Sequence, residues 1–223
     1  MKSITNTLML TVCIAAQAAE SGKRPPYLTG DQLIAELRGG TDAMRLFGKP
    51  YARGYIAGVV DATAGRMWCL TSEIPPETAD EQVMDALAGR PVGSMSTTAA
   101  ALLIEQYRSK FPLSGAACSV TPRLDGQKFV FWTSGNRRQS GSGRAATDTR
   151  LQELARFTDG YIAGAIDATQ ERDWCAPARI KPDELAAIAY WAVVELPTGA
   201  RPSNPATFLQ QLFVAKYPCR SHP

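Results

Sequence analysis

The stretch GYIAGVVDATAGRMWC (Gly54–Cys69) recurs as GYIAGAIDATQERDWC (Gly160–Cys175), at an offset of 106 residues. The same offset continues into the flanks without a gap, so that Pro76 matches Pro182 and Leu103 matches Leu209. Self-similarity at one fixed offset is typical of a duplicated structural unit. The sequence therefore predicts one unit used twice.

Proline, glycine and capping residues divide each copy into helices. The repeated stretch lies in a helix whose cap is Thr41 or Asp42 in the first copy and Thr147 or Asp148 in the second. A second helix starts at proline, and a third ends before proline, because proline suits the first turn and disfavours a helical residue before it. The first copy also has a leading helix that starts in LTGDQL (28–33), which the second copy lacks.

The segment between the copies, residues 113–146, differs in character. Residues 127–133 read QKFVFWT, a pattern that predicts a short strand, and residues 134–144 form a polar, glycine-rich linker. We therefore expect an all-α protein of two tandem helical repeats, 19–112 and 147–223, with a short β-containing insert between them. Disulfide bonds are expected to staple each repeat.

The N-terminus has the pattern of a secretory signal. A short apolar run ends in Ala16-Gln17-Ala18, which predicts cleavage after Ala18 and export of the remaining chain. Nothing later is apolar enough to predict insertion in a membrane. The net charge of the whole chain is only +3, which does not favour nucleic acid as a partner.

The exported part has four cysteines. An even number in an exported chain favours disulfides over metal binding. The simplest pairing joins Cys69 to Cys118 and Cys175 to Cys219, one bond in each copy, although four cysteines allow three connectivities.

Glycine and aspartate both recur inside the repeated helix, although both residue types disfavour a helix. Glycine in a helix interior costs about 1 kcal/mol relative to alanine, so the pairs Gly54/Gly58 and Gly160/Gly164 indicate tight packing against another helix or, alternatively, a groove for a partner helix. Aspartate is also a poor residue in mid-helix. For Asp61 and Asp167 we favour a buried hydrogen bond to the start of a neighbouring helix over a catalytic carboxylate.

Residues for the common catalytic chemistries are missing from the sequence. The sole histidine, His222, lies beside the C-terminus, and there is no CxxC pair, phosphate-binding loop or dinucleotide motif. We therefore expect no enzyme, no cofactor and no metal. A hydrolase that uses carboxylates alone is the enzyme class left open.

The order of motifs resembles the Rap/Tai family of small periplasmic immunity proteins. These motifs are the LTGDQL helix, GYIAGVVDA followed by cysteine, a proline-started helix and a closing aromatic-Pro-Cys, and they cover residues 28–112 and again 147–219. The chain departs from the family in having two units, and in Leu113 where the second copy has cysteine. The resemblance implies a periplasmic protein that binds and blocks a peptidoglycan amidase toxin of a type VI secretion system. The alternative is a periplasmic structural or chaperone-like protein.

A protein that blocks a cleft needs an element that protrudes from a rigid scaffold. The candidates are the loops Ala88–Thr97 and Thr198–Asn204 and the insert between Lys128 and Arg138. Aromatic and arginine side chains often dominate an interface, and the insert supplies Phe129, Phe131, Trp132, Arg137 and Arg138. Alternatively, Phe129 and Phe131 cover a helix face.

Overall fold

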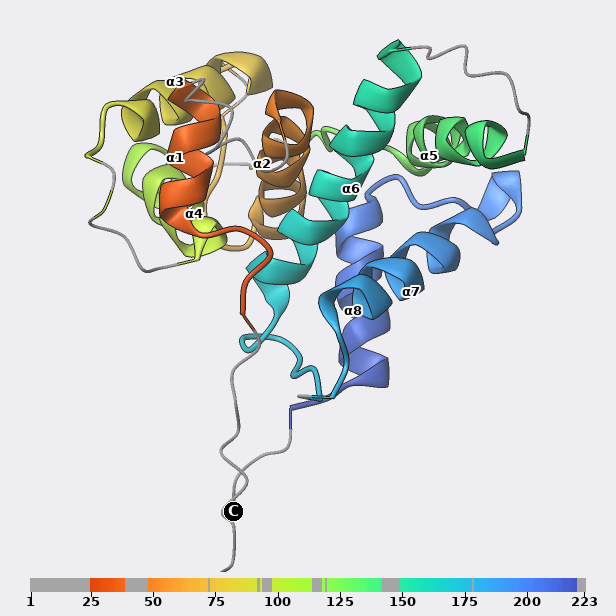
Figure 1. The fold of residues 1–223 in the computed structure, drawn as a ribbon. Helices are drawn as coiled ribbons and strands as arrows, with labels where there is room; N and C mark the ends of the chain where they lie inside the picture. Colours follow the sequence, from red (N-terminus) through yellow and green to blue (C-terminus); the bar gives the residue numbers. More distant parts are fainter. Residues whose placement is uncertain are drawn as a thin grey trace, which may run out of the picture.

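A computed structural model describes residues 25–38, 48–71, 73–91, 93, 98–113, 118, 120–141, 149–177 and 179–219. These residues form eight α-helices and one short 3-10 helix, without a sheet, so the all-α fold class is confirmed (Figure 1). The first copy contains α1 (Gly30–Arg38), α2 (Lys49–Thr63), α3 (Pro76–Ala88) and α4 (Ala99–Lys110). The second contains α5 (Gly126–Gly141), α6 (Thr149–Thr169), α7 (Pro182–Val194), η2 (Thr198–Ala200) and α8 (Pro205–Lys216).

The proline signals mark helix ends as expected. Helices α3 and α7 have Pro76 and Pro182 in their first turn, where a missing N–H costs no helical hydrogen bond. Helices α4 and α8 stop at Phe111 and Tyr217, each directly before a proline. The proposed caps at residues 41–42 and 147–148 lie outside the described residues. In the structure, α2 begins directly after Gly48, and α6 begins at Thr149.

The predicted strand at residues 127–133 is wrong, because this segment forms the first half of α5, and the predicted linker continues the helix to Gly141. The carboxylate of Asp125 accepts the Lys128 N–H at 2.8 Å, which caps the helix. Phe129 and Thr133, one turn apart, are both buried. The strand preference of aromatic residues is weak, and here capping and burial of one helical face override it.

The second copy also has a leading helix, which is α5. The expectation that only the first copy has one is therefore wrong. The sequence LDGQKF (124–129) matches LTGDQL (28–33) at its leucine, its glycine and its apolar last residue. Leu28 and Leu124 are both fully buried. The offset here is 96 residues rather than 106, because the second copy has ten more residues before its GYIAG stretch. The two leading helices are therefore out of register with the repeat at offset 106.

Helices α2 and α6 cross at the centre of the molecule, with the remaining helices of each copy on either side (Figure 1). At the crossing, the backbones touch through glycine. A Cβ on Gly58 would lie 2.1 Å from the carbonyl oxygen of Tyr161, and one on Gly164 would lie 2.1 Å from that of Tyr55. The face that these glycines leave open is thus filled by the helix of the other copy, and not by an external helix.

Each copy has the same disulfide-bonded corner. Cys69 is bonded to Cys118 and Cys175 to Cys219, the pairing expected from the spacing. In the second copy, the Cys175 N–H donates to the Tyr217 carbonyl at 2.9 Å, and Trp174 stacks on Phe213 with ring centroids 4.5 Å apart. The first copy repeats this arrangement with Cys69, Phe111, Trp68 and Tyr107. The bond therefore fastens the end of the last helix to the turn after the central one.

Replacing Gly58 or Gly164 with alanine should destabilise the fold by about 3 kcal/mol, because the added methyl group meets backbone that cannot move without separating α2 from α6. Urea unfolding followed by circular dichroism measures this. Gly89→Ala is the matched control, since its Cβ would come no nearer than 3.7 Å to another atom. If the Gly58 and Gly164 variants unfold at the parent's midpoint, the close backbone contact does not exist.

Candidate functional site

The two recurring aspartates hold the leading helices by reciprocal contacts between the copies. Asp61 of α2 accepts the backbone N–H groups of Arg123 and Leu124, just before α5, at 2.8 and 3.2 Å. Asp167 of α6 accepts those of Tyr27 and Leu28, just before α1, at 2.8 and 3.4 Å. We call this pair of contacts the reciprocal latch. Each copy therefore holds the leading helix of the other.

Two tyrosines of the GYIAG stretches complete the reciprocal latch. The Tyr161 hydroxyl donates to Asp61, and the Tyr55 hydroxyl donates to Asp167, both at 2.9 Å. Burial and the neighbouring carboxylate raise the pKa of both tyrosines. Both phenols thus remain neutral donors.

The latch carboxylates are held by hydrogen bonds, which is the structural role favoured from sequence. Burial raises the pKa of Asp61 to about 6, while the hydrogen bonds from Arg123, Tyr161 and Leu124 oppose that rise. In the part of the chain that the structure describes, no cluster of histidine, cysteine or acidic residues could hold a metal ion. No described helix is long and apolar enough to cross a membrane.

The aromatic residues proposed to bind a partner divide into core and surface. Phe129 is fully buried and meets the Tyr161 ring edge-on, at 6.3 Å between centroids, so it belongs to the core. Trp132 is half-buried against Phe157 of α6. Phe131 is 65% exposed, which makes it the most exposed of the three aromatic residues. Arg137 and Arg138 lie in α5, but their side chains are outside the described part.

Two of the three proposed binding elements form a single surface. The Gln127 side chain, at the start of α5, donates to the Thr198 carbonyl at 2.6 Å and accepts from Arg201 at 2.7 Å. The loop Thr198–Asn204 is thus tied to α5. A hollow of about 500 Å³, which we call the α5–loop groove, lies between them and is lined by Gln127, Lys128, Val130, Phe131 and Arg201.

The equivalent loop of the first copy, Ala88–Thr97, is hydrogen-bonded to α1 through those of its residues that the structure describes. The Gly93 N–H donates to the Asp31 carboxylate at 2.9 Å, and Arg38 donates to the Ala88 carbonyl at 2.7 Å. The loop between α3 and α4 is therefore held by α1, and the loop between α7 and α8 is held by α5.

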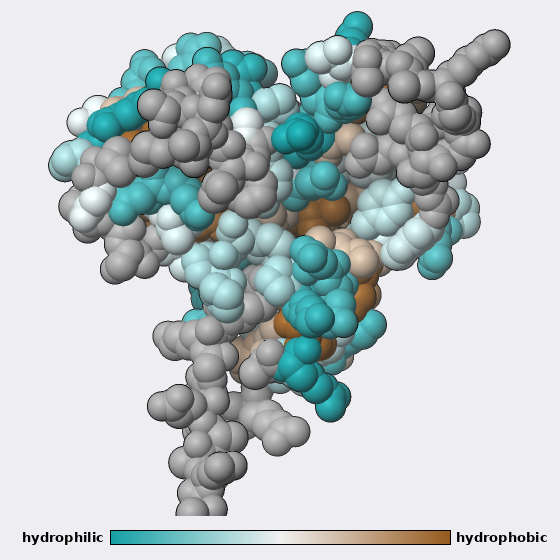
Figure 2. Space-filling model, viewed as in Figure 1, coloured by the Kyte–Doolittle hydropathy of each residue, from teal (hydrophilic) through white to brown (hydrophobic). Residues whose placement is uncertain are grey.

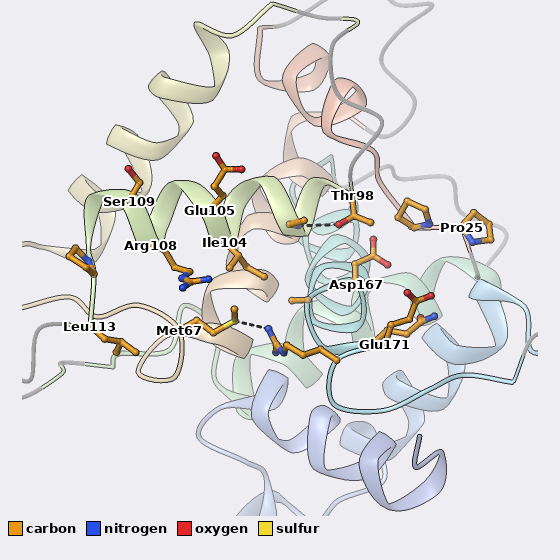
Figure 3. Close-up of a pocket in the computed structure, with 16 residues that line it drawn as sticks. Pro25, Met67, Thr98, Ile104, Glu105, Arg108, Ser109, Leu113, Asp167 and Glu171 are labelled. Atoms are coloured by element: carbon orange, nitrogen blue, oxygen red, sulfur yellow. Dashed lines mark hydrogen bonds between the residues drawn. The ribbon is translucent and has the colours of Figure 1, made fainter. Parts of the chain in front are cut away.

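A second hollow, of about 1080 Å³, lies where α4 passes the C-terminal end of α6 (Figure 3). Ile104 and Arg108 line it from α4, and Met67 and Glu171 come from the turns after α2 and α6. Sequence reasoning missed this groove, because its residues come from four separate segments and carry no motif. Its mixed apolar and charged lining could bind a peptide segment.

The outer surfaces of the two copies differ in polarity. Helix α3 has the polar residues Glu81, Gln82 and Asp85. The equivalent positions of α7, which lie 106 residues later, have the apolar residues Ala187, Ile188 and Trp191. Figure 2 shows hydrophobic surface on the side of α6 to α8 and mostly hydrophilic surface on the side of α3. Exposed apolar surface next to a polar rim is typical of protein–protein interfaces. The second copy is therefore the better candidate for binding another protein.

Comparison with known proteins gave one family. A family model described as Rap1a immunity proteins matches the chain twice, over residues 29–113 and 126–219. The second match begins at the first residue of α5, so it includes the leading helix of the second copy. No curated protein and no solved structure matches the chain in the other two comparisons.

Folding stability should fall as the pH rises from about 4 to about 7. The pKa of Asp61 is about 6 in the folded protein against an ordinary value of 3.8, so folding favours its protonated form, and this contribution is lost as the pH passes 6. Urea unfolding at several pH values should show a smaller decrease for Asp61→Asn than for the parent, by on the order of 2 kcal/mol. Burial raises the pKa of Asp159 to about 6 as well, so Asp159 contributes a decrease of the same sign in both the parent and the variant. Equal slopes in parent and variant would contradict the assignment.

Proposed function

The chain belongs to the Rap1a immunity protein family, and from that premise we propose that it protects its host cell by binding and blocking a secreted peptidoglycan amidase. The observation that carries the proposal is the family match in both copies. The motif resemblance, which links this kind of protein to amidase toxins of type VI secretion systems, supplies the toxin class. We infer inhibition by occlusion, without chemistry on the part of this chain.

We further propose that the protein acts in the periplasm, where such a toxin would meet peptidoglycan. The apolar run before Ala18 supports export. Two disulfides, Cys69–Cys118 and Cys175–Cys219, support an oxidising compartment.

A rigid scaffold suits an inhibitor that occludes an enzyme, because little conformational entropy is lost on binding. The reciprocal latch, the glycine crossing and the two disulfides all restrain the helices that carry the loops. The Thr198–Asn204 loop is fixed to α5 at two points, through Gln127 and through the Gly126 N–H, which donates to the Pro202 carbonyl at 2.9 Å. Such a loop could enter an active-site cleft in a preset conformation.

An amidase encoded beside this gene should bind the purified protein with nanomolar affinity and lose its peptidoglycan-cleaving activity at equimolar ratio. Isothermal titration calorimetry and an assay on isolated peptidoglycan measure the two effects. The protein alone should leave the peptidoglycan unchanged. Absence of binding to neighbouring amidases, together with normal survival of cells that lack the protein when they face toxin-producing competitors, would overturn the proposal.

The exported protein should begin at Ala19. Intact-mass measurement on a periplasmic extract should give the mass of residues 19–223 minus four hydrogen atoms for the two disulfides. Recovery of the chain from the cytoplasm with Met1 and five free thiols would contradict the proposed compartment.

A further inference from the structure

The two leading helices present different chemistry at equivalent positions. In the described part of α5, residues 126–133, the exposed residues are Gln127, Lys128 and Phe131, and Gln127 is bonded to Arg201 of the loop. The sequence match of the leading helices places Asp31 at the position of Gln127, and a buried Ala35 at that of Phe131. The carboxylate of Asp31 is bonded to its own loop at Gly93. A basic and aromatic groove thus exists in the second copy, where the first copy has an acidic group.

The Arg201 guanidinium is held in place but is not neutralised. One of its terminal nitrogens donates to Gln127, whose amide is itself bonded to the Thr198 carbonyl. No ion pair among the described residues includes Arg201, and its Nε–H is buried without a hydrogen-bond acceptor. Buried donors in folded proteins are rarely left without a partner. Among the described residues, no carboxylate therefore offsets the positive charge of Arg201, which remains available to pair with an anionic group.

The rest of the groove favours a carboxylate that lies next to an apolar group. Lys128 lines the same hollow, with its ammonium 3.4 Å from Asp125 and the side chain 60% exposed, so its charge is only partly offset. Phe131 and Val130 supply apolar surface. A planar guanidinium matches a carboxylate by paired hydrogen bonds, and such charge-assisted bonds are among the stronger ones.

We propose that the α5–loop groove is a docking site for an acidic segment of the toxin, in which a carboxylate pairs with Arg201 and a neighbouring apolar side chain packs on Phe131. This proposal rests on the proposed function and assigns its binding face. Because the first copy has Asp31 and Ala35 instead, one chain binds one toxin molecule through its second copy.

Affinity for the neighbouring amidase tests the site. Arg201→Glu should weaken binding by at least about tenfold and Arg201→Gln less, because reversal adds repulsion to the loss of a charge-assisted pair. Arg108→Glu is the matched control: it makes the same change of charge at the groove of Figure 3 and should alter the affinity by less than about twofold. Urea unfolding of each variant, with Arg201→Lys as a milder change, separates loss of folding from loss of binding.

Chemical cross-linking of the unaltered complex gives a second readout. A carbodiimide that joins amines to carboxylates without a spacer should link Lys128 to an aspartate or glutamate of the amidase, as identified by mass spectrometry. If the amidase binds but Arg201→Glu binds equally well and no cross-link forms at Lys128, the docking site is wrong while the proposed function stands. Weakening by Arg108→Glu alone would move the site to the groove of Figure 3. An amidase that does not bind the parent protein overturns both.

Discussion

The contact on which the rest of the structure depends is the crossing of α2 and α6, where backbone meets backbone through glycine. A Cβ at Gly54, Gly58, Gly160 or Gly164 would lie about 2 Å from a carbonyl oxygen of the opposite helix. This approach brings Tyr161 within hydrogen-bond distance of Asp61, and Tyr55 within that of Asp167. The aspartates in turn fix where α1 and α5 begin. The positions of the outer helices therefore follow from the separation of the central pair.

Much of this arrangement could be predicted from residues that are poor choices for a helix. Glycine and aspartate at Gly58 and Asp61 disfavour a helix locally, so their recurrence indicated a tertiary reason, and the structure supplies one in the crossing and the reciprocal latch. Helix ends at Pro76 and Pro112 were also predictable, because proline restricts the backbone locally.

The parts that escaped prediction depend on contacts between distant segments. The aromatic residues at the start of α5 favour a strand locally, whereas the factors that decide its structure are the Asp125 cap and the burial of Phe129 against Tyr161. The Gln127–Arg201 bond joins residues 74 positions apart, and no local pattern marks it. Of the three aromatic residues that the insert was expected to offer to a partner, Phe131 is exposed, Trp132 is half-buried and Phe129 is buried. Side-chain direction on α5 could not be known before its secondary structure.

Joining both copies in one chain changes how the surface can evolve. In a symmetric homodimer, every substitution occurs twice, on both faces, so a change that improves one face also alters its twin. Here Asp85 and Trp191 occupy equivalent helices but are encoded separately, so each face can acquire its own chemistry while the shared centre is preserved. The pairing is also independent of dilution, because the second copy is always tethered beside the first. A fused pair of this kind can keep one face for solubility and commit the other to recognition, even when few molecules are present in the cell.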